Sequence, residues 1–447
     1  MHNRKILIIG EVDVDQHLDI IENGYSTSRL GGIFHAARSC DALNIEYALA
    51  YYAPDYLVKD VEKFGVDVLG ANSVFRLGKV YKAPNVMLIG QSDESGNQLY
   101  ENILGKQAEY VNILPLMQIL DDFRPSDIII FPGRYGNAKI LSDLSDYEGK
   151  IHIDMNYDCD DILDLDKIKF QTVFLSTSST SFEEFFKEIS YDNLIKYFGK
   201  KRVSQLLIKE NRGGSWLYDF RDKTSYEAPA HIGETIHSVG VGDVYDIAFM
   251  SELVGTNIAG NMAFAAWMSS LYAQTLQQEK FKDNIELIVH NIPDFVEMEG
   301  IRVPWNVRVN YPIYMAAPDF DYVDTEKLDV LEASLLYHNF KPRRPIQENG
   351  QVNRDMDMNE ERAIFAKDMD LLLECKIMIA TLLYNDQGTL VEIGNYQASG
   401  KPIILYDPYL KLDNMFLKNS CTYYCKTKSQ VIDAVFTAIS RMVKNGE

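Results

Sequence analysis

Short apolar runs alternate with longer stretches of helical periodicity along most of the chain. In the N-terminal part these runs predict buried strands at 5–10, 48–52, 128–131, 150–154, 172–175 and 205–208. The alternation of strand and helix from Asp127 onward is typical of a parallel sheet covered by helices. Residues 73–104 are rich in β-forming residues broken by glycine and proline, which predicts a small antiparallel addition. Helical pattern dominates from Asp243 to about Val289.

This rhythm stops between about 295 and 310, and strand signal restarts at Tyr311. We therefore predict a first domain at 1–297, a linker at 298–310 and a second domain at 311–447. In the second domain an apolar run at 377–383 is followed by a polar turn, a helical pattern to Ala398 and another apolar run at 403–406. This order predicts a strand, turn, helix and strand of the parallel α/β type.

Two carboxylates follow the first of those strands. Ligands of parallel α/β sheets bind at the carboxyl ends of strands, where Asp386 and Glu392 fall. Glu392 lies one turn into the predicted helix, and its spacing alone favours a solvated or dipole-stabilising carboxylate over a reactive one.

Four separated motifs add to this interpretation. They are Ile313–Phe320 with Tyr314, Phe365–Asp368, Asp386–Gly394 (Asp-x-Gly-Thr-x-x-Glu-x-Gly) and Asp413–Met415. In this order they resemble the nucleoside 2-deoxyribosyltransferase family, from about residue 311 to the end of the chain. The resemblance implies a flavodoxin-like (Rossmann-type) parallel α/β domain that moves or releases nucleobases.

The same resemblance implies roles for single residues. Glu392 is the expected nucleophile, which bonds the sugar C1′, and Tyr314 is its expected hydrogen-bond partner. Asp368 and Asp386 are expected to contact the nucleoside and manage the proton on the base, and the sequence leaves open which acid does which. Asn414 matches a residue that reaches the sugar in a neighbouring subunit's site, which predicts a homo-oligomer.

One position bears on the choice of substrate. Related 5′-monophosphate N-glycosidases tend to have Ser where this chain has Asp386, and a carboxylate there would repel a phosphate. We therefore expect nucleosides rather than nucleotides. Arg343 and Arg344 keep a phosphate-bearing substrate open, although both can equally be solvated.

The first domain has motifs of its own. Ser238-Val-Gly-Val-Gly-Asp243 opens a predicted helix, and further signals are Asp13 and Asp15, Gly31 and Gly32 with His35, and Lys209 to Gly214. Together they resemble the ribokinase-like (PfkB-type) carbohydrate and nucleoside kinases over about residues 3–295, which implies an α/β/α domain with a small β lid. Gly240 and Gly242 would let backbone N–H groups close around a phosphate, and Asp243 would take a proton from a substrate hydroxyl.

By the same resemblance, Asp13, Asp15, Gly31, Gly32 and His35 lie on the sugar side. Lys209 and Gly214 lie on the nucleotide side, and ATP and Mg²⁺ are the implied ligands. Glycosyl transfer in the second domain needs no cofactor, and no metal site is predicted.

Several positions depart from the kinase pattern. They are Asp13, His35, His237-Ser238 before the glycines, Val241 between them, and 175–180, which lacks the Asn-x-x-Glu motif linked to magnesium. An active kinase with an altered substrate and a retired kinase that only binds ligands both remain open.

Composition limits the binding partners and the cell compartment that are expected. A net charge of −21 argues against nucleic acid or an anionic membrane as the main partner, and 46% hydrophobic residues describe a globular protein. The five cysteines, Cys40, Cys159, Cys375, Cys421 and Cys425, are few and scattered, which suits a reducing compartment and core thiols rather than zinc. The N-terminus leads into a short first strand, so a signal peptide is not expected and the predicted location is the cytoplasm.

Three functions follow. The first is a nucleoside deoxyribosyltransferase or N-glycoside hydrolase with Glu392 as nucleophile, acting on nucleosides, free bases or sugars. The second is an ATP-dependent sugar or nucleoside kinase with Asp243 as base. The third is a nucleotide sensor without catalysis. The second domain keeps all the motif residues of the family that it resembles, whereas the first domain departs from its family at several positions. This difference favours the first function, glycosyl transfer or hydrolysis.

Overall fold

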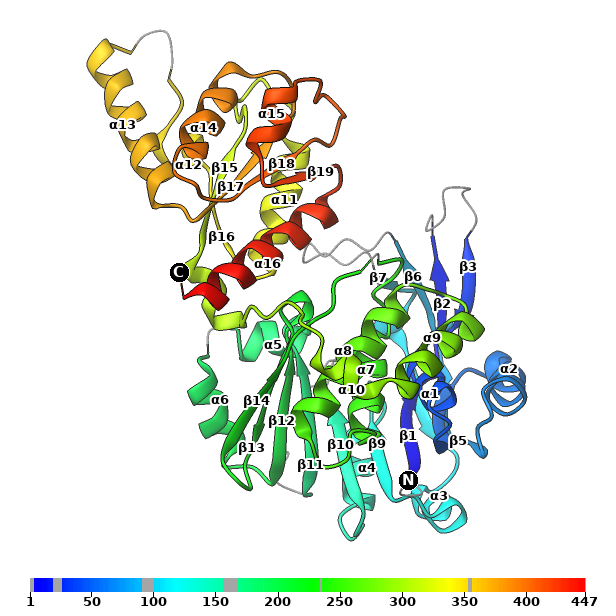
Figure 1. Cartoon of the computed structure of the whole chain (residues 1–447). Helices are drawn as coiled ribbons and strands as arrows, with labels where there is room; N and C mark the ends of the chain where they lie inside the picture. Colours follow the sequence, from blue (N-terminus) through cyan, green and yellow to red (C-terminus); the bar gives the residue numbers. More distant parts are fainter. Residues whose placement is uncertain are drawn as a thin grey trace. The chain divides into compact units, whose positions relative to one another are not determined.

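A computed structural model of the chain describes residues 4–18, 26–90, 100–155, 168–187, 189–233, 235–352 and 356–446. These residues form two compact units, one reaching to Gly300 and the other beginning at Ile301 (Figure 1). Among the helices in these ranges, none combines the length and the apolar character needed to cross a membrane. Each unit has its own sheet and its own core, and each is described by itself below.

The first unit is built on a ten-stranded sheet whose central strands are parallel. In sheet order the strands are β14 (Thr224–Ala228), β13 (Ser215–Asp219), β12 (Val203–Lys209), β11 (Phe170–Ser176), β10 (Lys150–Asp154), β9 (Asp127–Ile130), β1 (Lys5–Glu11), β4 (Glu46–Ala53), β5 (Ser73–Tyr81) and β8 (Glu109–Asn112). The strands from β12 to β5 run parallel, and β14, β13 and β8 complete the two edges in antiparallel fashion. The central strands are buried on both faces, which explains why they read as continuous apolar runs.

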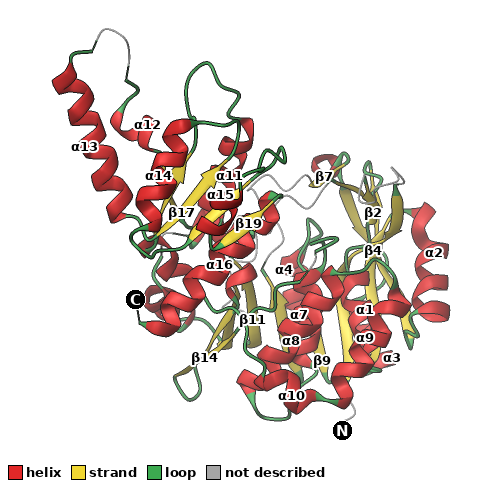
Figure 2. Ribbon diagram, turned by 45° about the horizontal axis from the view of Figure 1, so that its top comes forward, coloured by secondary structure: helices red, strands yellow, loops and turns green. Residues whose placement is uncertain are grey.

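Helices cover this sheet, and one group of them supplies most of its main core. That group is α1 (Phe34–Ala42), α7 (Val241–Met250), α8 (Ile258–Ala273) and α9 (Gln278–His290). The other helices of the unit are α2 (Val58–Lys63), α3 (Leu116–Phe123), α4 (Asn137–Asp143), α5 (Thr180–Phe185), α6 (Tyr191–Phe198) and α10 (Ile292–Glu297). Figure 2 shows α1, α7, α8 and α9 side by side on one face of the sheet. The expected α/β architecture, a mostly parallel sheet covered by helices, is thus confirmed.

A second, smaller sheet forms the lid. Its order is β3 (Thr27–Leu30), β2 (Val14–His17), β6 (Val86–Ile89) and β7 (Tyr100–Asn102). The predicted antiparallel addition at 73–104 is therefore divided, because β5 joins the main sheet while β6 and β7 join the lid. Sequence reasoning placed no strand at β2, whose inward-facing residues Asp15 and His17 are polar, so that no apolar alternation marks it.

The second unit contains a five-stranded, all-parallel sheet. Its order is β16 (Lys341–Arg343), β15 (Pro312–Ala316), β17 (Ile377–Thr381), β18 (Ile403–Tyr406) and β19 (Tyr423–Cys425). Numbered along the chain, this is the order 2-1-3-4-5 of flavodoxin-like folds, which confirms the predicted fold class. The helices are α11 (Glu326–Tyr337), α12 (Pro345–Asn349), α13 (Met358–Glu374), α14 (Gln387–Gln397), α15 (Met415–Ser420) and α16 (Lys428–Asn445).

Part of the predicted linker packs into the second unit. Arg308 is fully buried and donates hydrogen bonds to the carbonyls of Val303 and His338, each at 3.1 Å. Its guanidinium lies 4.8 Å from the ring centroid of Phe436 in α16. The predicted domain bounds remain a prediction, but the chain from Ile301 onward belongs structurally with the second unit.

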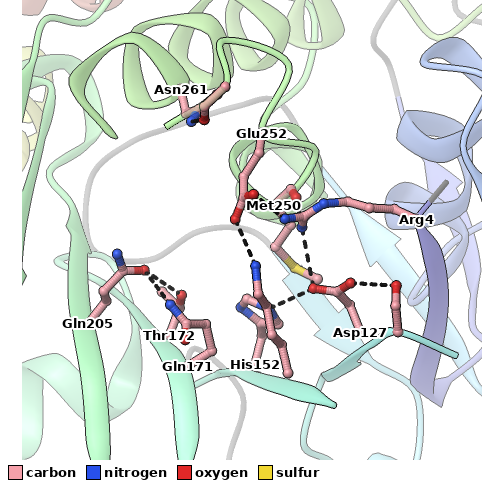
Figure 3. A network of polar contacts seen from close by, with 12 residues as sticks. Arg4, Asp127, His152, Gln171, Thr172, Gln205, Met250, Glu252 and Asn261 are labelled. Carbon is pink, nitrogen blue, oxygen red and sulfur yellow. Dashed lines mark hydrogen bonds and ion pairs between the residues drawn. The ribbon is translucent and has the colours of Figure 1, made fainter. Parts of the chain in front are cut away.

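The amino ends of the parallel strands in the first unit are joined by a network of polar groups around the buried Asp127 and His152 (Figure 3). Asp127 accepts hydrogen bonds from Ser126 Oγ at 2.7 Å and from Arg4 at 3.3 Å, and His152 Nε2 lies 3.5 Å from it. Arg4 also pairs with Glu252, which follows α7. This network lies at the opposite ends of the strands from the predicted ligand site, so we interpret it as structural.

Candidate functional site

The carboxyl end of the second unit's sheet brings Tyr314 and Glu392 together. Tyr314 is fully buried on β15, which is hydrogen-bonded to β17, and Glu392 lies on α14, the helix that follows β17. Because β15 and β17 are neighbours in the sheet, α14, the helix that follows β17, begins beside β15. The Tyr314 hydroxyl donates a hydrogen bond of 2.5 Å to Oε1 of Glu392. This is the pair that the sequence motifs predicted.

Burial raises the pKa of Glu392 to about 7. The hydrogen bond from Tyr314 lowers this pKa, and the charges of Asp368 and Asp386 raise it further. Burial and the charge of Glu392 raise the pKa of Tyr314, so the phenol stays protonated and remains a donor. Glu392 is thus a poorly solvated carboxylate that ionises close to neutral pH, which suits a group that has to act as a nucleophile.

Asp368 lies near this pair on α13. Its charge raises the pKa of both Tyr314 and Glu392. Burial raises the pKa of Asp368 itself, and Nδ2 of Asn349 donates a hydrogen bond of 2.8 Å to its Oδ1. Sequence reasoning missed Asn349, because a lone Asn at the end of the short helix α12 carries no spacing signal.

Asp386 caps the helix that carries Glu392. Its carboxylate accepts hydrogen bonds from the backbone N–H of Thr389 at 2.6 Å and from the Thr389 hydroxyl at 2.8 Å. The Asp-x-Gly-Thr part of the motif therefore folds locally as a helix N-cap. A direct contact between Asp386 and a nucleoside remains a prediction.

Asn414 is exposed and caps α15. Its side-chain oxygen accepts from the backbone N–H groups of Phe416 at 2.8 Å and Leu417 at 3.2 Å. The preceding loop is held by the buried Asp407, which accepts from the backbone of Lys411 at 2.7 Å. The structure thus fixes the position of Asn414 but gives it no described hydrogen bond to Tyr314 or Glu392.

Arg343 and Arg344, the two arginines that could hold a substrate phosphate, are both paired with carboxylates. Arg343 contacts Glu348 at 2.6 Å and Glu374 at 3.0 Å. The buried Arg344 pairs with Asp319, Asp329 and Glu332, the last at 2.8 Å. A substrate phosphate would have to compete with these carboxylates for either guanidinium.

In the first unit, the glycine motif forms the start of α7. Gly240 is the N-cap residue with a φ of +73°, a conformation that favours glycine, and Asp243 lies buried in the first turn. The amine of Lys209 lies behind this turn, 2.8 Å from Asp246 and 3.0 Å from Asp154, and donates to the Gly242 carbonyl at 3.3 Å.

Lys209 was predicted to lie on the nucleotide side. Its amine joins β12, β10 and α7, and the role on the nucleotide side remains a prediction. Burial would lower its pKa, but Asp154 and Asp246 raise it, so the amine remains charged. Gly214, at the turn between β12 and β13, has a φ of +98°, which favours glycine there.

The sugar-side residues are also brought together. Asp15 faces Gly31, whose missing Cβ would lie 2.0 Å from the Asp15 carboxylate. The ring of His35 lies against Gly240 in the same way, at 2.0 Å from the position of a Cβ. Gly32, with a φ of +58°, lies against the Glu11 carbonyl. The Asp15 carboxylate thus covers Gly31, and the His35 ring covers Gly240.

Asp13 lies between two other acids of the same stretch. Burial, together with the charges of Glu11 and Asp15, raises the pKa of Asp13 well above its usual range. Glu11 was not singled out from the sequence, because it appeared only as part of a turn. Its carboxylate accepts from the hydroxyl of Tyr110 at 3.0 Å.

Fold and site define the second unit as a flavodoxin-like α/β domain with a partly buried, phenol-bonded carboxylate at the carboxyl end of its sheet. Comparison with known families agrees with this: the family model described as nucleoside 2-deoxyribosyltransferase matches residues 313–419. Residues 313–419 are thus similar to this family. No curated protein matches the sequence.

Solved structures match the first unit. A ribokinase from Arabidopsis thaliana, complexed with ribose and ATP, is 15% identical, covers 66% of this chain and 99% of its own, and has a TM-score of 0.47. Ribokinases from Giardia lamblia and Thermotoga maritima are each 13% identical, cover 65% and 64% of this chain and 99% of their own, and have TM-scores of 0.48 and 0.46.

Proposed function

We propose that the second unit cleaves the N-glycosidic bond of nucleosides through a covalent intermediate on Glu392. The observation that supports this most is the 2.5 Å hydrogen bond from Tyr314 to a partly buried carboxylate whose pKa is raised to about 7. A carboxylate with this environment is ionised in a substantial fraction of molecules at neutral pH, yet little water stabilises its charge. Both properties favour attack on an electron-poor carbon.

The proposed reaction has two displacements. In the first, the bond between C1′ and the base nitrogen breaks, its electron pair leaves with the base, and a Glu392 oxygen bonds to C1′. In the second, the nitrogen of an incoming base or the oxygen of water bonds to C1′ and releases Glu392. Two inversions give net retention at C1′. An incoming base makes the protein a transferase, and water makes it a hydrolase.

The geometry suggests which oxygen attacks. Oε1 of Glu392 is held by the Tyr314 hydroxyl, which leaves Oε2 to bond the sugar. In this proposal the Tyr314 hydroxyl orients the carboxylate and stabilises its negative charge until the bond to C1′ forms. We expect Asp368 rather than Asp386 to exchange a proton with the base, because burial raises the pKa of Asp368.

Two further features of the substrate and the assembly belong to this proposal. We expect nucleosides rather than nucleotides, since Asp386 is a carboxylate and both Arg343 and Arg344 are paired within the protein. We also expect a homo-oligomer in which Asn414, exposed at the start of α15, completes a neighbouring subunit's site.

A panel of 2′-deoxyribonucleosides and free bases, followed by chromatography, tests the proposal. A new nucleoside identifies a transferase, and free base alone identifies a hydrolase. Glu392→Gln should abolish either product, with Glu374→Gln as a matched control on the exposed end of α13. Base exchange that continues in Glu392→Gln would refute the proposed nucleophile.

A kinase activity of the first unit is the second candidate, favoured by Asp243 at the glycine-capped start of α7. The fit to ATP and Mg²⁺ is partial: the α7 start suits a phosphate, whereas Lys209 is bonded to Asp154 and Asp246. Within the described residues, no cluster of three or more acidic, His or Cys side chains suits a metal ion. Magnesium-dependent ATP consumption that disappears in Asp243→Asn would establish this activity, and its absence with every nucleoside and sugar tried would remove it.

A further inference from the structure

Asn349, at the end of α12, contacts the acid Asp368 on α13. Its Nδ2 donates a hydrogen bond of 2.8 Å to Oδ1 of Asp368, and both side chains are half-buried. Asp368 in turn acts on the candidate site through its charge, which raises the pKa of Tyr314 and of Glu392. Asn349 therefore bears on the candidate site through Asp368.

The direction of this hydrogen bond decides which oxygen of Asp368 can carry a proton. Nδ2 of Asn349 is a donor, so Oδ1 has to accept, and an acid proton is left to Oδ2. Burial raises the pKa of Asp368, which favours the protonated form, and the hydrogen bond from Asn349 lowers it, which favours the carboxylate. Asn349 thus suits both states of the acid, because it orients the proton in one state and stabilises the charge in the other.

The two helices that carry this pair are also connected elsewhere. Arg343 contacts Glu348 of α12 at 2.6 Å and Glu374 of α13 at 3.0 Å. Pro345, at the start of α12, is buried. These contacts hold α12 against α13 without Asn349, so a tether between the helices is not what the Asn349 amide has to supply.

We propose that Asn349 is a positioning residue for the transfer of a proton to the departing base. This inference rests on the glycosyl-transfer proposal and deepens it. As C1′ bonds to Glu392, the base nitrogen takes both electrons of the broken bond and the proton from Oδ2 of Asp368. The N–H of Asn349 stabilises the negative charge that remains on Asp368. When a new base attacks, the proton on its nitrogen moves to Asp368 as that nitrogen bonds to C1′.

This role predicts a dependence on the base that departs. An ordinary base needs a proton in order to leave as a neutral molecule, and Asp368 supplies it. In 7-methyl-2′-deoxyguanosine the base already carries a positive charge, so it leaves as a neutral molecule without that proton. Loss of the Asn349 amide should therefore slow the cleavage of ordinary nucleosides and spare that of the methylated one, whereas loss of a residue that only supports the fold would slow both alike.

The rates of Asn349→Leu with two substrates test the inference. The substrates are 7-methyl-2′-deoxyguanosine and the unmodified 2′-deoxyribonucleoside on which the parent chain is most active. With the unmodified nucleoside, kcat should fall about 10- to 100-fold, as expected for the loss of a hydrogen bond to a developing charge. With the methylated nucleoside, kcat should change by less than about threefold. Equal losses with both substrates, or no loss with either, would overturn the inference.

Further variants separate positioning from folding. Asn349→Gln, which keeps the amide one methylene further out, should recover part of the loss. Asn359→Leu is the matched control, because Asn359 is exposed on α13, and both rates should stay unchanged. Thermal unfolding checks that Asn349→Leu is folded, and Asn349→Ala carries the same expectation if it is not.

The same measurements distinguish failure of this inference from failure of the glycosyl-transfer proposal. A parent chain that is inactive on every nucleoside, or activity that survives Glu392→Gln, would overturn both. An active parent chain whose Asn349→Leu variant is slowed equally on both substrates would overturn the role of Asn349 alone.

Discussion

At the scale of the residue, Glu392 experiences two opposing effects. Burial and the neighbouring acids Asp368 and Asp386 raise its pKa, while the hydrogen bond from Tyr314 lowers it, with a net value of about 7. The ionised form, which is the nucleophile, therefore becomes the major form only above neutral pH. The rate of glycosyl transfer should rise with pH through this region.

Tyr314→Phe tests the contribution of the phenol. Loss of a hydrogen bond to a charged group costs about 1.5–3 kcal/mol, so kcat/KM should fall roughly 10- to 100-fold. The pKa of Glu392 should rise, which moves the midpoint of the rate profile to higher pH. An unchanged midpoint would show that Tyr314 does not stabilise the charged form. Tyr396→Phe is a suitable control, since that hydroxyl bonds the Cys375 carbonyl at 3.0 Å instead.

Glu392→Gln should also stabilise the protein in a pH-dependent way. In the folded state this carboxyl has a pKa raised from 4.5 to about 7, so between these values unfolding releases a proton and stability falls as pH rises. Glu392→Gln has no titrating carboxyl group at this position, so it does not lose this stability as the pH rises. Its free energy of unfolding, relative to the parent, should therefore grow by about 2–3 kcal/mol from pH 4 to pH 8. Denaturant melts at several pH values measure this, and a pH-independent difference would contradict the raised pKa.

At the scale of the element, α14 depends on its cap. Asp386 accepts two hydrogen bonds from Thr389 at the start of the helix, and Glu392 lies less than two turns further on. Asp386→Asn keeps a good cap and should change stability little, whereas Asp386→Ala should cost about 0.5–2 kcal/mol.

The same pair of variants separates two roles of Asp386. Asp386→Asn removes a charge that raises the pKa of Glu392, so it should move the rate profile to lower pH. If Asp386 also contacts the base, Asp386→Asn should lose activity far beyond this shift. If Asp386→Asn and Asp386→Ala lose equal stability, the N-cap hydrogen bonds are not what Asp386 contributes to the stability of the protein.

Elements with a regular apolar pattern could be predicted from the sequence, and irregular ones could not. The buried parallel strands β1, β9 and β17 read directly as apolar runs. The lid strand β2 did not, since Asp15 and His17 occupy its inward positions and are stabilised by groups far away in the chain. The Tyr314 and Glu392 pair could be predicted because motifs mark both residues. Asn349 could not, because its contact with Asp368 is a tertiary contact of a position that no motif marks.

At the scale of the whole molecule, each unit has its own sheet and core, and the proposed chemistry resides in one of them. The proposed role of Asn414 makes activity depend on association between chains. Specific activity should therefore fall on dilution once the oligomer dissociates. Sedimentation across the same concentrations provides the comparison. Activity per chain that stays constant while the protein becomes monomeric would exclude a contribution from a neighbouring subunit.

Trapping the covalent intermediate tests the central claim most directly. The protein is incubated with a 2′-deoxyribonucleoside, quenched in acid and digested, and the peptides are examined by mass spectrometry. We expect the mass of a deoxyribosyl group on the peptide that contains Glu392, lost when a free base is added before quenching and absent from Glu392→Gln. A glycosyl group on another residue would contradict the proposed mechanism. Base exchange that continues in Glu392→Gln, without any adduct, would contradict it as well.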